Sequence, residues 1–295
     1  MIEKHSKASG IGLERLCTQD WMRSTETEYG VEFLEAWFQG RAYQKHRHDT
    51  YAISLTTAGI QAFDYRGHSE ISTPGQVVVL HPDEVHDGHA GTEEGFGYRE
   101  LYVEPALIFE AIQTMCTHNC SLPFVCAPVT MNQKLSAAVI NAFQDTRESL
   151  AIDSLIMQLA EGLMEADPSC KQAPLPRHLD VAALKRAGQY LDTQKTRVVH
   201  SLELEAVTGL TRYDLARQFR IMCGTSPYRY LLMRRLDFAR EQLVQGRSLA
   251  EVAIEAGFAD QAHFSRMFKA TFGITPARYQ AMRVVKGANV EQHNH

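Results

Sequence analysis

Residues 248–258 read SLAEVAIEAGF and residues 264–279 read FSRMFKATFGITPARY, and these two stretches decide the fold of the C-terminal part of the chain. A short apolar helix is expected to end at Gly257, because glycine readily adopts the positive φ that stops a helix. The helix that follows is expected to end at Gly273, and Thr275-Pro276 supplies an N-cap and a first-turn proline for the next one. Two helices joined by a tight glycine turn are typical of a helix-turn-helix unit.

The same pattern occurs a second time, 48 or 49 residues earlier in the chain. Thr211 is expected to cap the second helix of this earlier unit, and Asp214 favours the positive end of the helix dipole. Apolar residues four positions apart face the core in both units. The matched positions are Gly209, Leu215, Phe219, Gly224, Ser226-Pro227 and Tyr230 in the earlier unit, and Gly257, Phe264, Phe268, Gly273, Thr275-Pro276 and Tyr279 in the later one.

These stretches closely resemble the signature of AraC/XylS-type transcription regulators over about residues 180–283. In that family a long helix joins two helix-turn-helix units, and the resemblance places this helix at Pro227 to Val244. It places the first reading helix, the one that enters the major groove, at Arg212 to Arg220, and the second at Asp260 to Lys269. The residues that the resemblance implies as DNA contacts are Arg212, Tyr213, Arg217, Arg220, Gln261, Ala262, Arg266 and Lys269, with Ala216 on the same base-facing side.

The chemistry of these side chains suits DNA. The forked guanidinium of Arg217 or Arg266 matches the two acceptors of a guanine edge, and the amide of Gln261 suits adenine. Arg220 and Lys269 are expected to hold phosphates and to set the register. For any one of these arginines the alternative is a solvated surface charge.

The earlier unit departs from the pattern at one position. Glu205 stands where the later unit has Ala253, a small residue that allows close helix packing. A buried glutamate there would be costly without a partner. We therefore expect a local rearrangement of the first unit.

Charge separates the two ends of the chain, whose net charge is −5 over 295 residues. Residues 177–286 contain 18 Lys and Arg against 10 Asp and Glu, a net charge of +8, whereas residues 1–176 carry −12. A basic C-terminal part suggests a polyanionic partner. The sign changes at residues 167–176, where three prolines favour an extended linker. The expected organisation is a domain at 1–167, a linker at 168–178, a DNA-binding domain at 179–286 and a tail at 287–295.

The front part is expected to be β-rich. Short β-prone runs at 51–57, 77–80 and 98–103 favour an antiparallel sandwich or barrel. Residues 105–116 and 131–166 then change to a helical period. An apolar stripe in 131–166 either packs on the barrel or pairs with a second copy of the chain. The expected fold class is therefore α+β in two domains: an antiparallel barrel with helices after it, then an all-α domain.

Histidines in the front part resemble the motifs of a cupin barrel over about residues 30–104. Residues 40–48 have a Gly-x5-His-x-His spacing that ends in His46 and His48, Gly59 stands where that motif closes, and His86 takes the place of the second motif's histidine. The resemblance implies a small-molecule sensor whose ligand is held by His46, His48, Tyr51 and His86.

A metal site formed by His46, His48 and His86 is one alternative, because three imidazoles can ligate zinc or iron. The other alternative is that these histidines are structural residues at a strand start. Ala52 stands where the metal-binding motif has a glutamate, so no metal or other cofactor is expected. Arg99 and Glu100 either meet a charged ligand group or form a solvated strand face.

Six cysteines are expected to be reduced thiols, because no secretory signal or membrane span is evident and the chain is expected in the cytoplasm. Cys116-x3-Cys120 either forms a metal or redox pair or is simply buried. No catalytic motif stands out, so catalytic residues are not expected.

The expected function is regulation of transcription by a metabolite that binds the cupin domain. Activation is the expected direction of this regulation. The expected partners are double-stranded DNA, a sugar, amino acid or aromatic acid as effector, RNA polymerase and a second copy of the chain. One alternative is a metal-dependent cupin enzyme fused to a DNA-binding domain, and another is a regulator whose cupin serves only for dimerisation.

Overall fold

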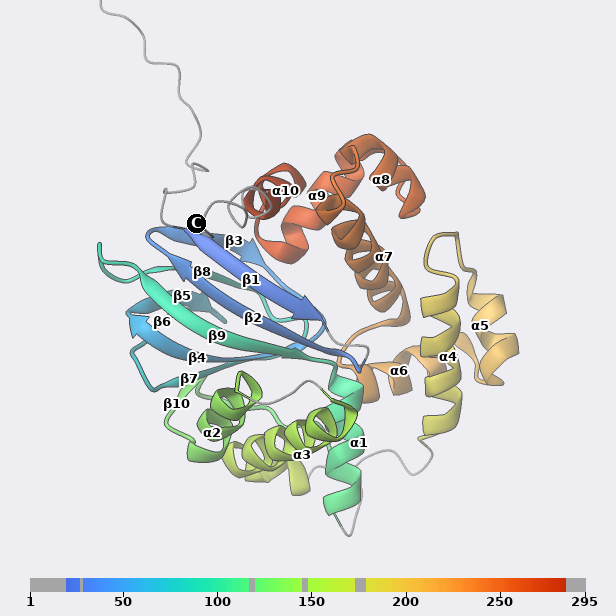
Figure 1. Cartoon of the computed structure of the whole chain (residues 1–295). Coiled ribbons are helices and arrows are strands. Elements are labelled where there is room, and N and C mark those ends of the chain that lie inside the picture. Colours follow the sequence, from blue (N-terminus) through green and yellow to red (C-terminus); the bar gives the residue numbers. More distant parts are fainter. Residues whose placement is uncertain (1–19, 27–28, 117–119, 145–147, 173–178, 285–295) are drawn as a thin grey trace, which may run out of the picture.

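A computed structural model describes residues 20–26, 29–116, 120–144, 148–172 and 179–284. It consists of an antiparallel β-rich domain followed by an all-helical domain, as expected from the sequence (Figure 1). The strands are β1 (Trp21–Glu26), β2 (Val31–Phe38), β3 (Arg41–His46), β4 (Tyr51–Gly59), β5 (Gln61–Tyr65), β6 (His68–Ser72), β7 (Val77–Leu80), β8 (His86–Ala90), β9 (Phe96–Val103) and β10 (Val129–Thr130).

The strands form two antiparallel sheets. A six-stranded sheet has the order β1-β2-β9-β4-β7-β10, and a four-stranded sheet has the order β3-β8-β5-β6. Alternate residues of a strand face opposite sides. On β9, Leu101 and Val103 pack toward helices, whereas Phe96 and Tyr98 face the other way, into a core that the β-rich domain shares with the helical domain.

Three helices cover the outer face of the larger sheet: α1 (Pro105–Met115), α2 (Gln133–Ala142) and α3 (Ser149–Ala166) (Figure 1). The stripe residues Leu135, Val139, Leu159 and Leu163 are fully buried against this sheet, so packing on the chain's own barrel accounts for most of the stripe. Leu150 is the exception, because its side chain is 79% exposed.

The second domain begins at α4 (Val181–Thr193) and contains the two expected helix pairs. These are α5 (Ser201–Thr208) with α6 (Arg212–Cys223), and α8 (Leu249–Glu255) with α9 (Gln261–Phe272). The joining helix α7 covers Pro227–Val244, which are the bounds expected from the sequence, and α10 (Pro276–Val284) follows. Within residues 179–284 the structure has no strand, as expected.

Helix ends follow the local sequence signals. Gly209, Gly224, Gly257 and Gly273 all have positive φ, between 68° and 77°. The Thr211 hydroxyl accepts a hydrogen bond from the Asp214 N–H at 3.2 Å. Ser226-Pro227 and Thr275-Pro276 begin α7 and α10 as expected, each with a hydroxyl that accepts a backbone N–H.

Two expectations are wrong. The Asp167–Pro176 segment does not begin as an extended linker, because Pro168–Lys171 forms a 3-10 helix (η1) that buries Cys170. Not all cysteines are free thiols either, because Cys116 and Cys120 form a disulfide. The end of α1 brings their Cα atoms to 6.5 Å, which is within bonding range.

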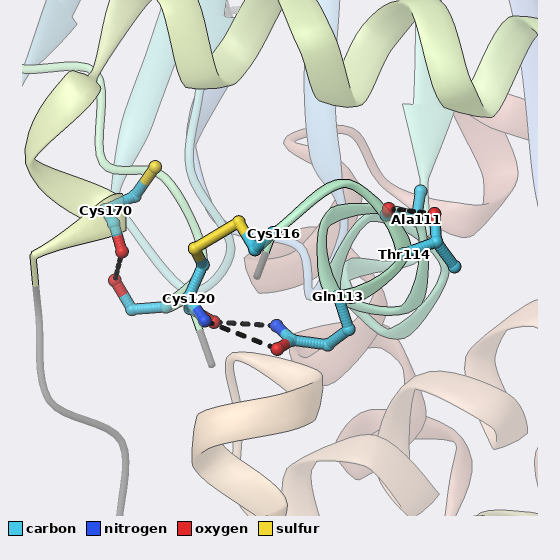
Figure 2. Close-up of a disulfide and its surroundings, with 7 residues drawn as sticks. Ala111, Gln113, Thr114, Cys116, Cys120 and Cys170 are labelled. Carbon is cyan, nitrogen blue, oxygen red and sulfur yellow. Dashed lines mark hydrogen bonds between the residues drawn. A yellow bond between two sulfur atoms is a disulfide. The ribbon is translucent and has the colours of Figure 1, made fainter. Parts of the chain in front are cut away.

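The disulfide is tied to α1 by one side chain (Figure 2). The Gln113 amide donates to the carbonyl of Cys120 at 2.7 Å, and its Oε1 accepts from the Cys120 N–H at 3.3 Å. The N–H of the next residue, Ser121, donates to the carbonyl of Cys170 at 3.0 Å. The pair therefore connects the end of α1 to η1.

Candidate functional site

The expected DNA contacts of the earlier unit lie on one exposed face of α6. Arg212, Tyr213, Ala216, Arg217 and Arg220 are exposed, and the Tyr213 side chain is 79% exposed. The intervening Leu215 and Phe219 are buried in the core that this unit shares with α4, as expected.

The later unit repeats this arrangement on α9. Gln261, Ala262 and Arg266 are exposed and Lys269 is half-buried, while Phe264 and Phe268 are fully buried. Asp260 caps the helix by accepting the His263 N–H at 2.6 Å. Both units therefore present the expected side chains on a surface that a DNA groove can reach.

Glu205 has a role that the sequence pattern did not reveal. Its Oε1 accepts the N–H of Arg212, the first residue of α6, at 2.7 Å. The same oxygen lies 3.6 Å from the Arg212 guanidinium. The glutamate therefore caps the reading helix from α5 and is not left buried without a partner.

Three of the four expected ligand residues meet where β3 ends and β8 begins. The ring centroids of His46 and His86 lie 4.2 Å apart, and those of His48 and His86 lie 4.8 Å apart. Each Nδ1 lies within 3.0 Å of a backbone carbonyl two residues away, to which it donates in the tautomer that leaves Nε2 as an acceptor. Tyr51 is elsewhere, because its hydroxyl donates to the Pro123 carbonyl at 2.8 Å in the core under the helices.

These histidines are held neutral. Burial lowers the pKa of His46 to about 4, lowers that of His48 to about 3, and lowers that of His86 well below 6.5. The Nε2 of His48 is buried and has no hydrogen-bond partner. Within the described ranges no group of three His, Cys, Asp or Glu side chains is arranged to hold a metal ion.

A cavity of about 90 Å³ lies next to these histidines, between the two domains. Its polar lining from the β-rich domain includes Tyr43, His46, His48, Tyr102 and three carboxylates: Glu32, Asp49 and Glu104. From α7 it is lined by Arg234, Asp237 and Arg240. Sequence reasoning missed all six charged residues, because the two groups lie about 130 to 208 positions apart in the chain.

Ion pairs join the domains at this cavity. The Arg234 guanidinium donates to Glu104 at 2.9 Å and to Asp49 at 3.3 Å. Arg240 donates to both oxygens of Glu32, at 2.8 and 3.1 Å. Nearby, Arg229 lies 3.2 Å from Asp83. Arginine is suited to such sites because its fork matches a carboxylate.

Backbone contacts add to this interface. The Gln44 N–H on β3 donates to the carbonyl of Gly273 at 3.0 Å, and the Arg47 N–H donates to that of Ala270 at 3.2 Å. A Cβ atom at Gly273 would lie 2.8 Å from the Gln44 carbonyl oxygen. The C-terminal end of α9 is therefore fixed directly to the edge of the β-rich domain.

Three buried carboxyl groups have raised pKa values. Burial raises the pKa of Glu104 to about 7, although Arg234 opposes the rise. Burial also raises the pKa of Asp49, and it raises the pKa of Glu100, inside the barrel, to about 7. Arg99 lies on the other side of β9 and pairs with Glu35 at 2.9 Å. The two residues therefore do not face one ligand group together, and the buried Glu100 is not part of a solvated strand face.

The sequence matches two family models in this order. Residues 28–160 match an AraC-like ligand binding domain, and residues 204–282 match a helix-turn-helix domain. None of the helices in the described ranges is long and apolar enough to cross a membrane.

Similar proteins are regulators of transcription. The HTH-type regulator YbfI of Bacillus subtilis is 25% identical over 78% of this chain and 85% of its own length. The HTH-type transcriptional activator RhaS of Yersinia pestis is 25% identical over 82% of this chain and 91% of its own.

Solved structures support the same fold. An apo variant of ToxT from Vibrio cholerae aligns with a TM-score of 0.60 at 15% identity, over 88% of this chain and 99% of that one. One assignment follows from the two matched domain models, the regulators among the relatives and the shared two-domain fold. The chain belongs to the AraC family of transcription regulators, with an AraC-like ligand-binding domain followed by a helix-turn-helix DNA-binding domain.

Proposed function

We propose that this chain activates transcription in response to a small molecule that binds the cavity between its domains. The observation that carries the proposal is that one cavity is lined by both the ligand-binding domain and α7, the helix that joins the two DNA-reading units. A ligand there binds one arrangement of the domains more tightly than another, and this differential affinity shifts the equilibrium.

The effector is expected to use His46 and His48 rather than Tyr51. Both histidines line the cavity, His86 lies behind them, and Tyr51 belongs to the core under the helices. A protein of the same fold, ToxT, has been solved with an unsaturated fatty acid bound. That likeness supports a small-molecule site in this fold but does not identify the ligand of this chain.

DNA is bound by α6 and α9 together, which read two successive major grooves on one side of the duplex. Arg217 and Arg266 contact bases, Arg220 and Lys269 hold phosphates, and Arg212, Tyr213, Gln261 and Ala262 complete the two surfaces. The proposed domain limits are 1–167 and 179–286, and the cavity lies where the two domains meet. Residues 173–178 of the linker and residues 285–295 lie outside the described ranges.

A second copy of the chain and RNA polymerase are the remaining partners. The exposed Leu150 on α3 and Met131 just before α2 leave apolar surface for a homodimer. The basic helical domain and the activator RhaS among the relatives support activation at a promoter. The resemblance to regulators gives no support to an enzyme, and a purely structural barrel would leave the interdomain cavity without a role.

The test is DNA binding by the full chain, measured by fluorescence anisotropy on duplexes selected from a random library. Arg266→Ala is expected to weaken binding to the selected site by about 1–3 kcal/mol and to relax sequence preference at one position. Arg41→Ala, which removes an exposed arginine on β3, is the matched control. Unchanged affinity and preference in the Arg266 variant would remove this residue from the reading surface.

A further inference from the structure

The interdomain cavity has more negative than positive groups. Four carboxylates line it, namely Glu32, Asp49, Glu104 and Asp237, against the two guanidinium groups of Arg234 and Arg240. Arg234 is shared among three carboxylates, at 2.9 Å from Glu104 and at 3.3 Å from each of Asp49 and Asp237. With all four carboxyl groups ionised, the site would lack positive charge. Burial raises the pKa of Asp49 and raises that of Glu104 to about 7, so a bound cation would favour their ionised forms.

A second, independent feature in the cavity is a buried acceptor without a donor. The His48 side chain is only 6% exposed and lines the cavity. Its Nδ1 lies 2.9 Å from the Thr50 carbonyl, which fixes the proton there and leaves Nε2 as an acceptor. No group of the described structure donates to this Nε2. A ligand that brings an N–H or O–H group would satisfy this acceptor.

The walls of the cavity suit an organic cation. Tyr43, Tyr102, Phe272 and Tyr279 line it, and aromatic rings attract ammonium and guanidinium groups through their electron-rich faces. The lining also includes the apolar side chains of Met22 and Leu34, which can contact a short hydrocarbon part of a ligand.

We propose that the effector is a small organic cation with N–H donors, an aliphatic amine or a guanidine. This inference rests on the proposed function and names the chemical class of its ligand. The cation binds among Glu32, Asp49 and Glu104 of one domain and Asp237 of the other, and donates to His48 Nε2. Because it joins carboxylates on both sides, it strengthens the contact between the sensor and α7.

Two other ligand classes fit less well. An anion could accept from the buried Arg234 Nε, which has no hydrogen-bond partner among the described residues, but it would lie beside four carboxyl groups. A metal ion needs several ligand atoms around one point, and the described residues offer no group of three His, Cys, Asp or Glu in such an arrangement.

The experiment is calorimetric titration of the full-length protein with agmatine and putrescine, with 1,4-butanediol as the neutral probe and succinate and oleate as anionic probes. Each titration is repeated with a chelator. We expect one of the two cations to bind saturably, with an affinity that the chelator leaves unchanged. Glu104→Gln and Asp237→Asn are each expected to weaken that binding by about tenfold or more.

Glu241→Gln is the matched control, because it neutralises an exposed carboxylate on α7, the helix of Asp237, outside the cavity lining. Circular dichroism verifies that each variant is folded, and Glu32→Gln replaces any variant that is not. The inference is overturned if neither cation binds, if only the diol or an anion binds, or if Glu241→Gln weakens cation binding as much as the cavity variants do.

Failure of this inference is distinguishable from failure of the proposed function. Saturable binding of succinate or oleate that is lost in Arg234→Ala would keep the effector site and change only the ligand class. Loss of all cation binding in chelator, with recovery on addition of Zn²⁺, would assign the site to a metal instead.

Discussion

Single residues show where a sequence pattern predicts a role and where it cannot. Gly209, Gly224, Gly257 and Gly273 were identified from spacing alone, because a helix stop needs positive φ and the signal lies within a few residues. The capping role of Glu205 depends on its reach across the turn to the Arg212 N–H, seven positions away. A substitution in a repeat therefore shows that a site differs but not how the difference is accommodated.

The pH dependence of stability is a prediction at the residue scale. Burial raises the pKa of Glu100 from the ordinary 4.5 to about 7. Between these two pH values the folded state still holds a proton that the unfolded state has already released. The stability that this group contributes is present below about pH 4.5 and is lost as pH rises through 7. Glu100→Gln should therefore stabilise the protein relative to wild type increasingly from pH 4.5 to 7, by about 3 kcal/mol at most.

The measurement is urea unfolding of both proteins at several pH values, with the difference in free energy of unfolding plotted against pH. Taking the difference removes the opposite contribution of His46, His48 and His81, whose lowered pKa values, about 4, 3 and 4, make the protein less stable as pH falls below 6.5. Glu241→Gln, at an exposed carboxylate on α7, is the control. A Glu100 difference that is constant, or that grows toward acid, would contradict the prediction.

At the scale of elements, helices and strands were predicted well wherever their signals are local. α7 and β7 have the bounds expected from the sequence, because capping residues, glycines and β-branched runs mark their ends. The Pro168–Lys171 turn was missed, because proline that starts a helix and proline in an extended linker have the same composition. For Cys116-x3-Cys120 the sequence leaves a metal or redox pair and a buried position as alternatives, because pairing depends on how α1 ends and not on cysteine spacing alone.

That disulfide supports a prediction for the end of α1. Closing a ring over Cys116–Cys120 removes chain entropy from the unfolded state, which for so short a loop stabilises the fold by about 2 kcal/mol. Cys116→Ser should lower the free energy of unfolding by about that amount, and dithiothreitol should do the same to wild type. Urea unfolding with and without the reductant measures both effects.

The destabilising effects of the reductant and of the substitution should not add. This distinguishes loss of the disulfide from a change in packing. Dithiothreitol should have no further effect on Cys116→Ser, and the double variant with Cys120→Ser should be close to the single one. Cys126→Ser, at an exposed free thiol, is the control. A reductant effect of equal size in the Cys116 variant would show that the bond is not its source.

At the scale of the whole molecule, the contact between the domains was beyond the reach of sequence. The helices α6 and α9 and the proximity of His46, His48 and His86 could be predicted, because each lies inside a local motif. The α7 arginines and their carboxylate partners form pairs 130 to 208 residues apart. No periodicity or spacing links such positions, so the cavity that they line exists only in the folded chain.

The Arg240–Glu32 pair allows a test of whether this contact holds the domains together. Both side chains are 13% exposed and joined by two hydrogen bonds, so removing one partner leaves a poorly solvated charge. Arg240→Ala should loosen the interface and speed hydrogen exchange at the Gln44 and Arg47 amides, which donate to the end of α9. Hydrogen–deuterium exchange with mass spectrometry resolves this segment.

A double-mutant cycle then measures the pair itself. Glu32→Gln and Arg240→Ala combined should destabilise less than the sum of the two single variants, with a coupling of about 1.5 kcal/mol or more. Arg99→Ala breaks a pair within the β-rich domain and should leave exchange at Gln44 and Arg47 unchanged. Because α7 carries both reading units, faster exchange should come with altered DNA affinity. Faster exchange with unaltered affinity would mean that the interface is structural and does not transmit the ligand signal.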